Sequence, residues 1–105
     1  MKVFFDECMP RPLIALLAGL EIETAQGMGW GRKKNGELLK LTETQFEVFV
    51  TTDRNLRYQQ NLKGRKIAIL VLTPNVLSVL LSNYVRIGAA IKAMQPGEYQ
   101  ELTLA

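Results

Sequence analysis

Short apolar runs that recur between helical patterns are the feature of this sequence that most constrains its fold. "KVFF" (residues 2–5), "EVFVTT" (47–52) and "KIAILVL" (66–72) are each typical of a buried strand. "LEIETA" (20–25) alternates like a strand, and "YQELTL" (99–104) is a candidate for one more edge strand at the C-terminal end. Strands that are apolar on both faces indicate a mostly parallel sheet covered by helices on both sides.

Helical patterns lie between these runs. We expect one helix after Pro10 that ends at Gly19, one that begins near Asn35, and one long helix over residues 76–94 that stops before "QPG". Right-handed crossovers then favour the strand order 2-1-3-4. The sequence therefore predicts a single α/β domain over residues 1–105, a three-layer sandwich around a mostly parallel sheet.

The composition excludes several classes of chemistry. The chain has no His, so Ser-His-Asp and Cys-His catalysis and most zinc sites are excluded, and carboxylates are the main chemical resource. Neither a secretory signal nor an apolar run long enough to span a membrane is present, and the single Cys fits a reducing compartment, so we expect a cytoplasmic protein without membrane contact. The net charge of +3 is compatible with a polyanionic partner.

Three acidic residues are the candidate site. Asp6 follows the first strand and Asp53 follows the third, and the order 2-1-3 brings the carboxyl ends of these strands together at a topological switch point. Glu37, in the first turn of the helix that leads to the third strand, is expected to point into the same crevice. Carboxylates that converge without His favour a hard cation such as Mg²⁺ or Mn²⁺.

Each of these acids also has a purely structural interpretation. Asp6 can cap the turn before Pro10, Asp53 can be a helix N-cap, and Glu37 is favoured near a helix N-terminus by the macrodipole alone. Cys8 is expected to pack as a small apolar residue.

Basic residues flank the acids in two segments. The glycine loop places Trp30 directly before a basic run, and a second basic segment follows Asp53. Such residues can hold the phosphates of a nucleic acid while an aromatic ring stacks on unpaired bases, although ordinary solvated charges and a Trp that anchors its loop are the alternative. The candidate nucleic-acid-binding residues are Trp30, Arg32, Lys33, Lys34, Arg54 and Arg57.

The stretches "KVFFDECMPRPLIALLAG", "GWGRKKNGELLKL" and "VFVTTDRNLRYQQNL" resemble the short PIN-like domains related to the toxin ribonucleases of bacterial toxin–antitoxin modules. The resemblance implies a PIN-like fold and a hydrolase, a Mg²⁺- or Mn²⁺-dependent endoribonuclease that cleaves RNA phosphodiester bonds. It also implies a homodimer that pairs with a small antitoxin protein. Carried over by position, Asp6, Glu37 and Asp53 match the metal-binding and catalytic acids. Glu7, Asn35 and Asn55 are accessory candidates.

Two alternatives stay open. Longer PIN nucleases carry a further acidic residue that this chain lacks, and Asn35 and Asn55 stand where related sequences often have acids, which fits a degenerate PIN-like module that only binds a partner. A phosphoacceptor receiver domain also places acids like Asp6 and Asp53 after its first and third strands and a hydroxyl like that of Thr73 after its fourth. It needs a Lys after the fifth strand, and "YQELTLA" contains none.

Overall fold

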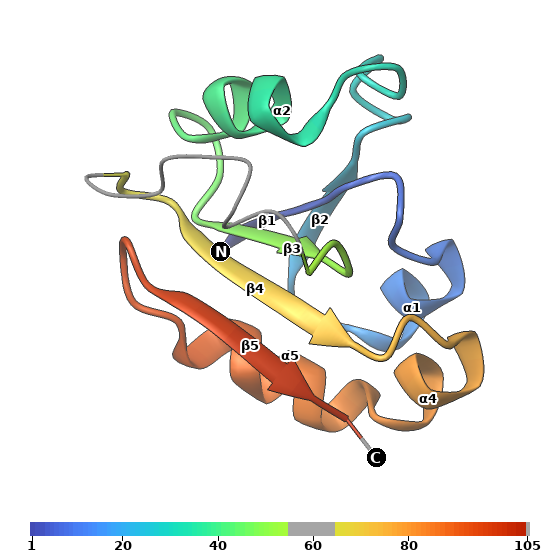
Figure 1. The fold of residues 1–105 in the computed structure, drawn as a ribbon. Helices are drawn as coiled ribbons and strands as arrows, with labels where there is room; N and C mark the ends of the chain where they lie inside the picture. Colours follow the sequence, from blue (N-terminus) through green and yellow to red (C-terminus); the bar gives the residue numbers. More distant parts are fainter. Residues whose placement is uncertain (55–64, 105) are drawn as a thin grey trace.

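A five-stranded, all-parallel sheet forms the centre of the protein, in the order β2-β1-β3-β4-β5 (Figure 1). The structure, a computed structural model, describes residues 1–54 and 65–104. The predicted order 2-1-3-4 is confirmed, and the candidate C-terminal strand pairs with β4 at the edge of the sheet. The strands are β1 (Lys2–Phe5), β2 (Glu21–Thr24), β3 (Val48–Thr51), β4 (Ala68–Thr73) and β5 (Tyr99–Thr103).

Helices cover both faces of the sheet, as the doubly apolar strands predict. α2 (Asn35–Thr42) lies on one face, and α1 (Arg11–Leu16), α4 (Leu77–Ser82) and α5 (Tyr84–Ala93) lie on the other (Figure 1). Successive residues of β1 point to opposite layers, so Phe4 packs in the core under α2 and Phe5 in the core under the other helices. Both rings are fully buried, which stabilises the fold by about 1.5–3 kcal/mol for each side chain.

The prediction of one helix over residues 76–94 is wrong in one respect, because the chain breaks at Asn83 into α4 and α5. The backbone of Asn83 leaves the helical region (φ −104°, ψ 21°), and its side-chain Nδ2 donates a 2.8 Å hydrogen bond to the Val79 carbonyl oxygen. The Asn83 backbone amide donates to the same oxygen at 3.2 Å. Asn side chains that bond to nearby backbone groups in this way are unfavourable in helix interiors. Among the described residues, no helix has the length and apolar character needed to cross a membrane.

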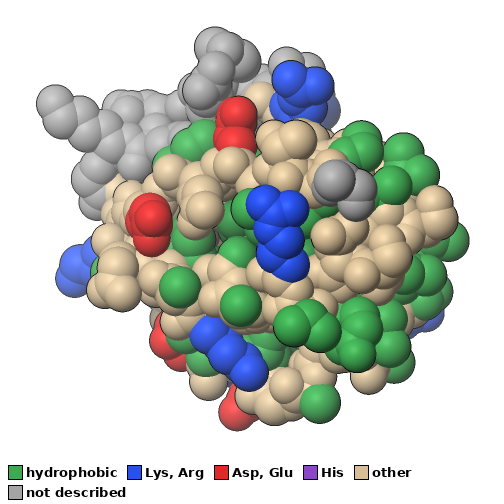
Figure 2. Space-filling view, turned by 90° about the horizontal axis from the view of Figure 1, so that it is seen from below, with side chains coloured by type: hydrophobic (Ala, Val, Ile, Leu, Met, Phe, Trp, Pro, Cys, Tyr) green, Lys and Arg blue, Asp and Glu red, His purple; other side chains and the backbone are tan. Residues whose placement is uncertain are grey.

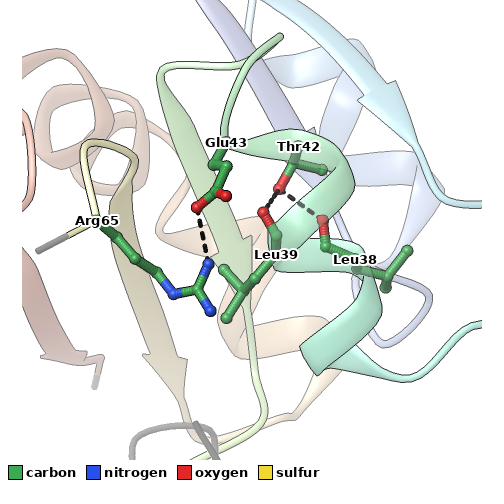
Figure 3. A network of polar contacts seen from close by, with 5 residues as sticks. All are labelled: Leu38, Leu39, Thr42, Glu43 and Arg65. Atoms are coloured by element: carbon green, nitrogen blue, oxygen red, sulfur yellow. Dashed lines mark hydrogen bonds and ion pairs between the residues drawn. The ribbon is translucent and has the colours of Figure 1, made fainter. Parts of the chain in front are cut away.

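An ion pair links the C-terminal end of α2 to the residues that lead into β4 (Figure 3). The Thr42 hydroxyl donates to the carbonyl oxygens of Leu38 and Leu39, at 2.7 and 3.2 Å, within the last turn of the helix. Beside it, Arg65 Nη1 donates to Glu43 Oε2 at 2.8 Å, and the guanidinium side chain is only 16% exposed. This ion pair connects α2 to the start of the β4 segment.

The turn between α5 and β5 depends on a glycine. Gly97 has a φ of +78°, and a Cβ there would lie 3.0 Å from the Arg65 carbonyl oxygen. Gly19 has a similar φ of +87°, but a Cβ there would meet no atom within 4 Å, so it is a matched control.

We predict that Gly19→Ala lowers the free energy of unfolding by about 1 kcal/mol and Gly97→Ala by about 2–3 kcal/mol. Urea denaturation followed by Trp fluorescence measures both, and equal losses would contradict the close approach at Gly97.

Candidate functional site

Asp6 and Asp53 lie at the carboxyl ends of neighbouring strands. β1 pairs in parallel with β3, with Phe5 opposite Val50, and the Asp6 amide donates to the Val50 carbonyl oxygen at 3.3 Å. The connection after β1 leads to β2 on one side of β1, and the connection after β3 leads to β4 on the other side. The predicted topological switch point is therefore present, and it is the position where open α/β sheets bind ligands.

Thr51 joins the two acids. Its hydroxyl donates a hydrogen bond to Asp6 Oδ2 and accepts one from the Asp53 amide, with an N···O distance of 3.0 Å. The other oxygen of Asp6, Oδ1, accepts from the Cys8 amide at 3.0 Å. Asp6 is 1% exposed, so these bonds compensate for the lost hydration of its carboxyl group.

The structure also shows the turn-capping role that the sequence suggested for Asp6. The bond from the Cys8 amide caps the turn after β1, and the Met9 amide donates to the Asp6 carbonyl oxygen at 3.1 Å. Capping and a chemical role are compatible here, because each carboxylate oxygen keeps further lone-pair capacity after one hydrogen bond. The segment that Asp53 would cap as a helix N-cap lies outside the described residues.

Cys8 is exposed, so the prediction that it packs as a small apolar residue is wrong. It stands in the turn after β1, where its backbone amide donates to Asp6 Oδ1. Partial burial of the thiol raises the pKa of Cys8, the negative charges of Asp6, Asp53 and Glu7 raise it further, and a hydrogen bond with Thr52 lowers it. Both candidate metal-binding acids, Asp6 and Asp53, therefore raise the pKa of this thiol.

Glu37 is placed differently from these acids. It lies in the first turn of α2, its side chain is 61% exposed, and its Oε2 is 3.7 Å from Lys33 Nζ, one turn earlier. Within residues 1–54 and 65–104, no group of three or more Asp, Glu, Cys or His side chains is arranged to hold a metal ion. The structure therefore brings Asp6 and Asp53 together but does not place Glu37 in a three-acid group with them.

The accessory candidates are only partly described. Glu7 is exposed in the turn after β1, next to Asp6. Asn35 is the first residue of α2. Asn55 and the basic candidate Arg57 lie outside the described residues.

Trp30 anchors its loop and is half-buried. Its ring centroid is 5.9 Å from that of Phe4, and its amide donates to the Ala25 carbonyl oxygen at 2.7 Å. One part of the ring therefore packs on the α2 side of the core. This agrees with the alternative in which Trp30 anchors its loop. Of the basic residues that follow, Arg32 and Lys34 are exposed and Lys33 is half-buried; Arg54, just after Asp53, is exposed.

Thr51 is the site residue that sequence reasoning missed. The signal for it was the pair of hydroxyl residues directly before the acid in "VTTD". A strand directs alternate side chains to opposite faces, so the sequence alone leaves open whether Thr51 or Thr52 faces Asp6.

Comparisons of this chain with protein-family models, with curated proteins and with solved structures found no match. The function must therefore be argued from the site itself: two acidic residues at a switch point, where one buried hydroxyl group bonds to the carboxylate of Asp6 and to the backbone amide of Asp53.

Removal of the Thr51 hydroxyl tests this bridge. Thr51→Val leaves a buried carboxyl oxygen of Asp6 and the Asp53 amide without their shared partner, so we predict that it lowers the free energy of unfolding by about 2–3 kcal/mol. Thr51→Ser keeps the hydroxyl and loses only a methyl group, so its loss should be about 1 kcal/mol. Urea denaturation compares the two variants, and a Val variant as stable as the Ser variant would contradict the bridge.

Proposed function

We propose that this protein is a PIN-like, metal-dependent endoribonuclease that hydrolyses RNA phosphodiester bonds. The observation that carries the proposal is the position of Asp6 and Asp53 at the switch point of a parallel sheet, where the Thr51 hydroxyl bonds to the Asp6 carboxylate and to the backbone amide of Asp53. In the absence of His, carboxylates that bind a divalent cation are the chemistry this site offers for phosphate. The resemblance of the sequence to PIN-like domains supports the same reaction.

The donor atoms at this site fit Mg²⁺ or Mn²⁺. Both ions prefer hard oxygen ligands, and Mg²⁺ is commonly held by one or two carboxylates with water and substrate phosphate oxygens as its other ligands. Asp6 and Asp53 would supply those carboxylates, and Glu37 is the proposed third acid. A bound cation would supply electrostatic stabilisation of the phosphoryl oxygens.

The described residues have separate tasks in this proposal. The Cys8 amide and the Thr51 hydroxyl fix the orientation of the Asp6 carboxylate, which keeps the acid in one position within a buried site. Arg32, Lys33 and Lys34 would hold backbone phosphates, which positions the RNA without reading its bases.

A degenerate module that only binds a partner is the second candidate. The observation that favours it is the position of Glu37, which is exposed, paired with Lys33 and outside any three-acid group of the described residues. A small antitoxin protein as partner and a homodimer are implied by the resemblance and belong to either proposal. Both remain predictions.

Neutralisation of the paired acids separates the two candidates. Asp53→Asn and Asp6→Asn keep the size of the side chain but lose the charge that a hard cation requires, so each should weaken Mn²⁺ binding at least about tenfold and abolish RNA cleavage. Calorimetric titration with Mn²⁺ and cleavage of a single-stranded RNA measure the two effects. Glu37→Gln in the same assays shows whether the third acid takes part.

Glu21→Gln is the matched control, because Glu21 is an exposed acid at the opposite end of the sheet, where β2 begins opposite Lys2 of β1. Its Mn²⁺ affinity and RNA cleavage should equal those of the wild type. Wild-type activity in folded Asp53→Asn would contradict the nuclease proposal. A folded wild-type protein that neither binds Mn²⁺ nor cleaves RNA would support the degenerate module.

The basic loop gives a further prediction. Replacing Arg32, Lys33 and Lys34 together with Ala should weaken RNA binding equally for different sequences, because phosphate contacts carry no base specificity. The dependence of log affinity on log salt should become shallower by about 0.7 for each lost contact with a single strand. Fluorescence anisotropy with two unrelated RNA oligonucleotides at several salt concentrations measures both quantities.

A triple Ala variant at Lys66, Arg86 and Lys92 is the control for total charge, since it removes one Arg and two Lys from elsewhere on the surface. If both triple variants change RNA affinity and salt slope to the same extent, net charge alone explains the binding. The basic loop then has no special part in it.

A further inference from the structure

An apolar groove lies between the end of α1 and one side of α5, away from the acidic site. Its lining includes Leu16, Leu20, Tyr84, Val85 and Gly88, and its volume is about 340 Å³. α1 begins a few residues after Asp6 and ends near the groove, just before β2, so the helix separates the two sites. The groove therefore makes no use of the residues assigned to RNA cleavage.

Large apolar side chains are exposed at this groove. Val85 is 68% exposed, Leu16 41% and Tyr84 40%. Gly88 also lines the groove, and a Cβ there would lie in van der Waals contact, 3.4 Å from Leu17 Cδ2. Contiguous exposed apolar surface that includes a small residue is typical of a site where another backbone approaches closely.

The charged side chains on the helices of this layer are all positive. The described helices of this layer, α1, α4 and α5, carry Arg11, Arg86 and Lys92 and contain no Asp or Glu. Lys92 lines the groove itself. Figure 2 shows the surface of this layer: hydrophobic side chains gather in its lower and right parts, Lys and Arg side chains lie among them, and Asp and Glu side chains lie toward its margins.

We propose that this groove docks an amphipathic helix of an acidic partner protein. The apolar side of such a helix would fill the groove with residues spaced at i, i+4 and i+7, and its Asp and Glu residues would face Lys92 and the cations beside it. A second copy of this chain fits less well, because two copies of the same face would bring like charges together. This inference stands independently of the ribonuclease proposal.

Two model peptides of about 18 residues test the charge preference, since shorter helices are marginal in water. Both carry a fluorescein label and the same Leu positions; one has Glu and the other Lys on the flanking positions. Fluorescence anisotropy should show that the Glu peptide binds at least about tenfold more tightly, and Lys92→Glu should remove most of that difference. Equal affinity for the two peptides would overturn the proposal.

Two Val→Glu variants locate the binding. Val85→Glu places a charge in the groove, whereas Val76→Glu places the same charge at a 45% exposed position outside it. Val85→Glu should weaken binding of the Glu peptide at least about tenfold, and Val76→Glu should leave it unchanged. Circular dichroism checks that both variants fold, and both substitutions are at exposed side chains. Equal weakening by the two variants would overturn the assignment to this groove.

Two other outcomes would also overturn it. If the protein binds phosphatidylglycerol vesicles but neither peptide, and Val85→Glu abolishes vesicle binding, the groove meets a membrane surface. If sedimentation shows a wild-type dimer that Val85→Glu dissociates and Val76→Glu does not, the groove is covered by a second copy. None of these measurements uses RNA or a metal, so their result is separate from that of the nuclease tests.

Discussion

The parallel pairing of β1 with β3 is the constraint on which the rest of this protein depends. It places β1 between β2 and β3, so Phe4 and Phe5 must both be buried, one in each helical layer. The same pairing sets the end of β1 beside the end of β3, where the Asp6 amide bonds to Val50 and its carboxylate to Thr51. One strand pairing thus determines the two cores and the candidate site together. A shift of its register by one residue would exchange the core faces and would also remove Thr51 from Asp6.

The strands β1, β3 and β4 were predictable from the sequence because each is a short apolar run whose burial on both faces leaves few alternatives. The β1 residues are those of "KVFF", and the preference for right-handed crossovers correctly favoured the order β2-β1-β3-β4. That preference does not account for β5, because α1 and α5 cover the same face of the sheet although β2 and β5 lie at opposite edges. The break between α4 and α5 was not predictable from periodicity, because the apolar spacing continues through Asn83. At Asn83 the backbone leaves the helical region, and the Asn83 side-chain Nδ2 joins the backbone amide as a second donor to the Val79 carbonyl oxygen. Such a bond depends on a side-chain rotamer, and hydrophobic patterning carries no information about rotamers.

The candidate site was also predictable from the sequence only in part. That Asp6 and Asp53 meet follows from topology alone, since both come directly after neighbouring parallel strands. Thr51 was missed because topology locates a strand end but not the face to which each side chain turns. Glu37 shows the limit of the same reasoning: the first turn of a helix can present a side chain to the crevice or to solvent, and here it pairs with Lys33 at the surface. Cys8 is exposed although Met9, the next residue of the same turn, is buried in the core, and the sequence does not show which of the two turns inward.

The distribution of charge says more about partners than the net value of +3 does. Acids lie at both ends of the sheet, whereas the layer of α1, α4 and α5 has only cations on its helices, beside exposed Val85 and Leu16. Cations scattered over a convex polar surface would favour a polyanion, because phosphate contacts need charge and no hydrophobic groove. Cations beside an apolar groove favour a ligand with both an apolar and an acidic face. The basic loop after Trp30 and the groove at α5 are thus different kinds of surface, and a single polyanionic partner would account for only one of them.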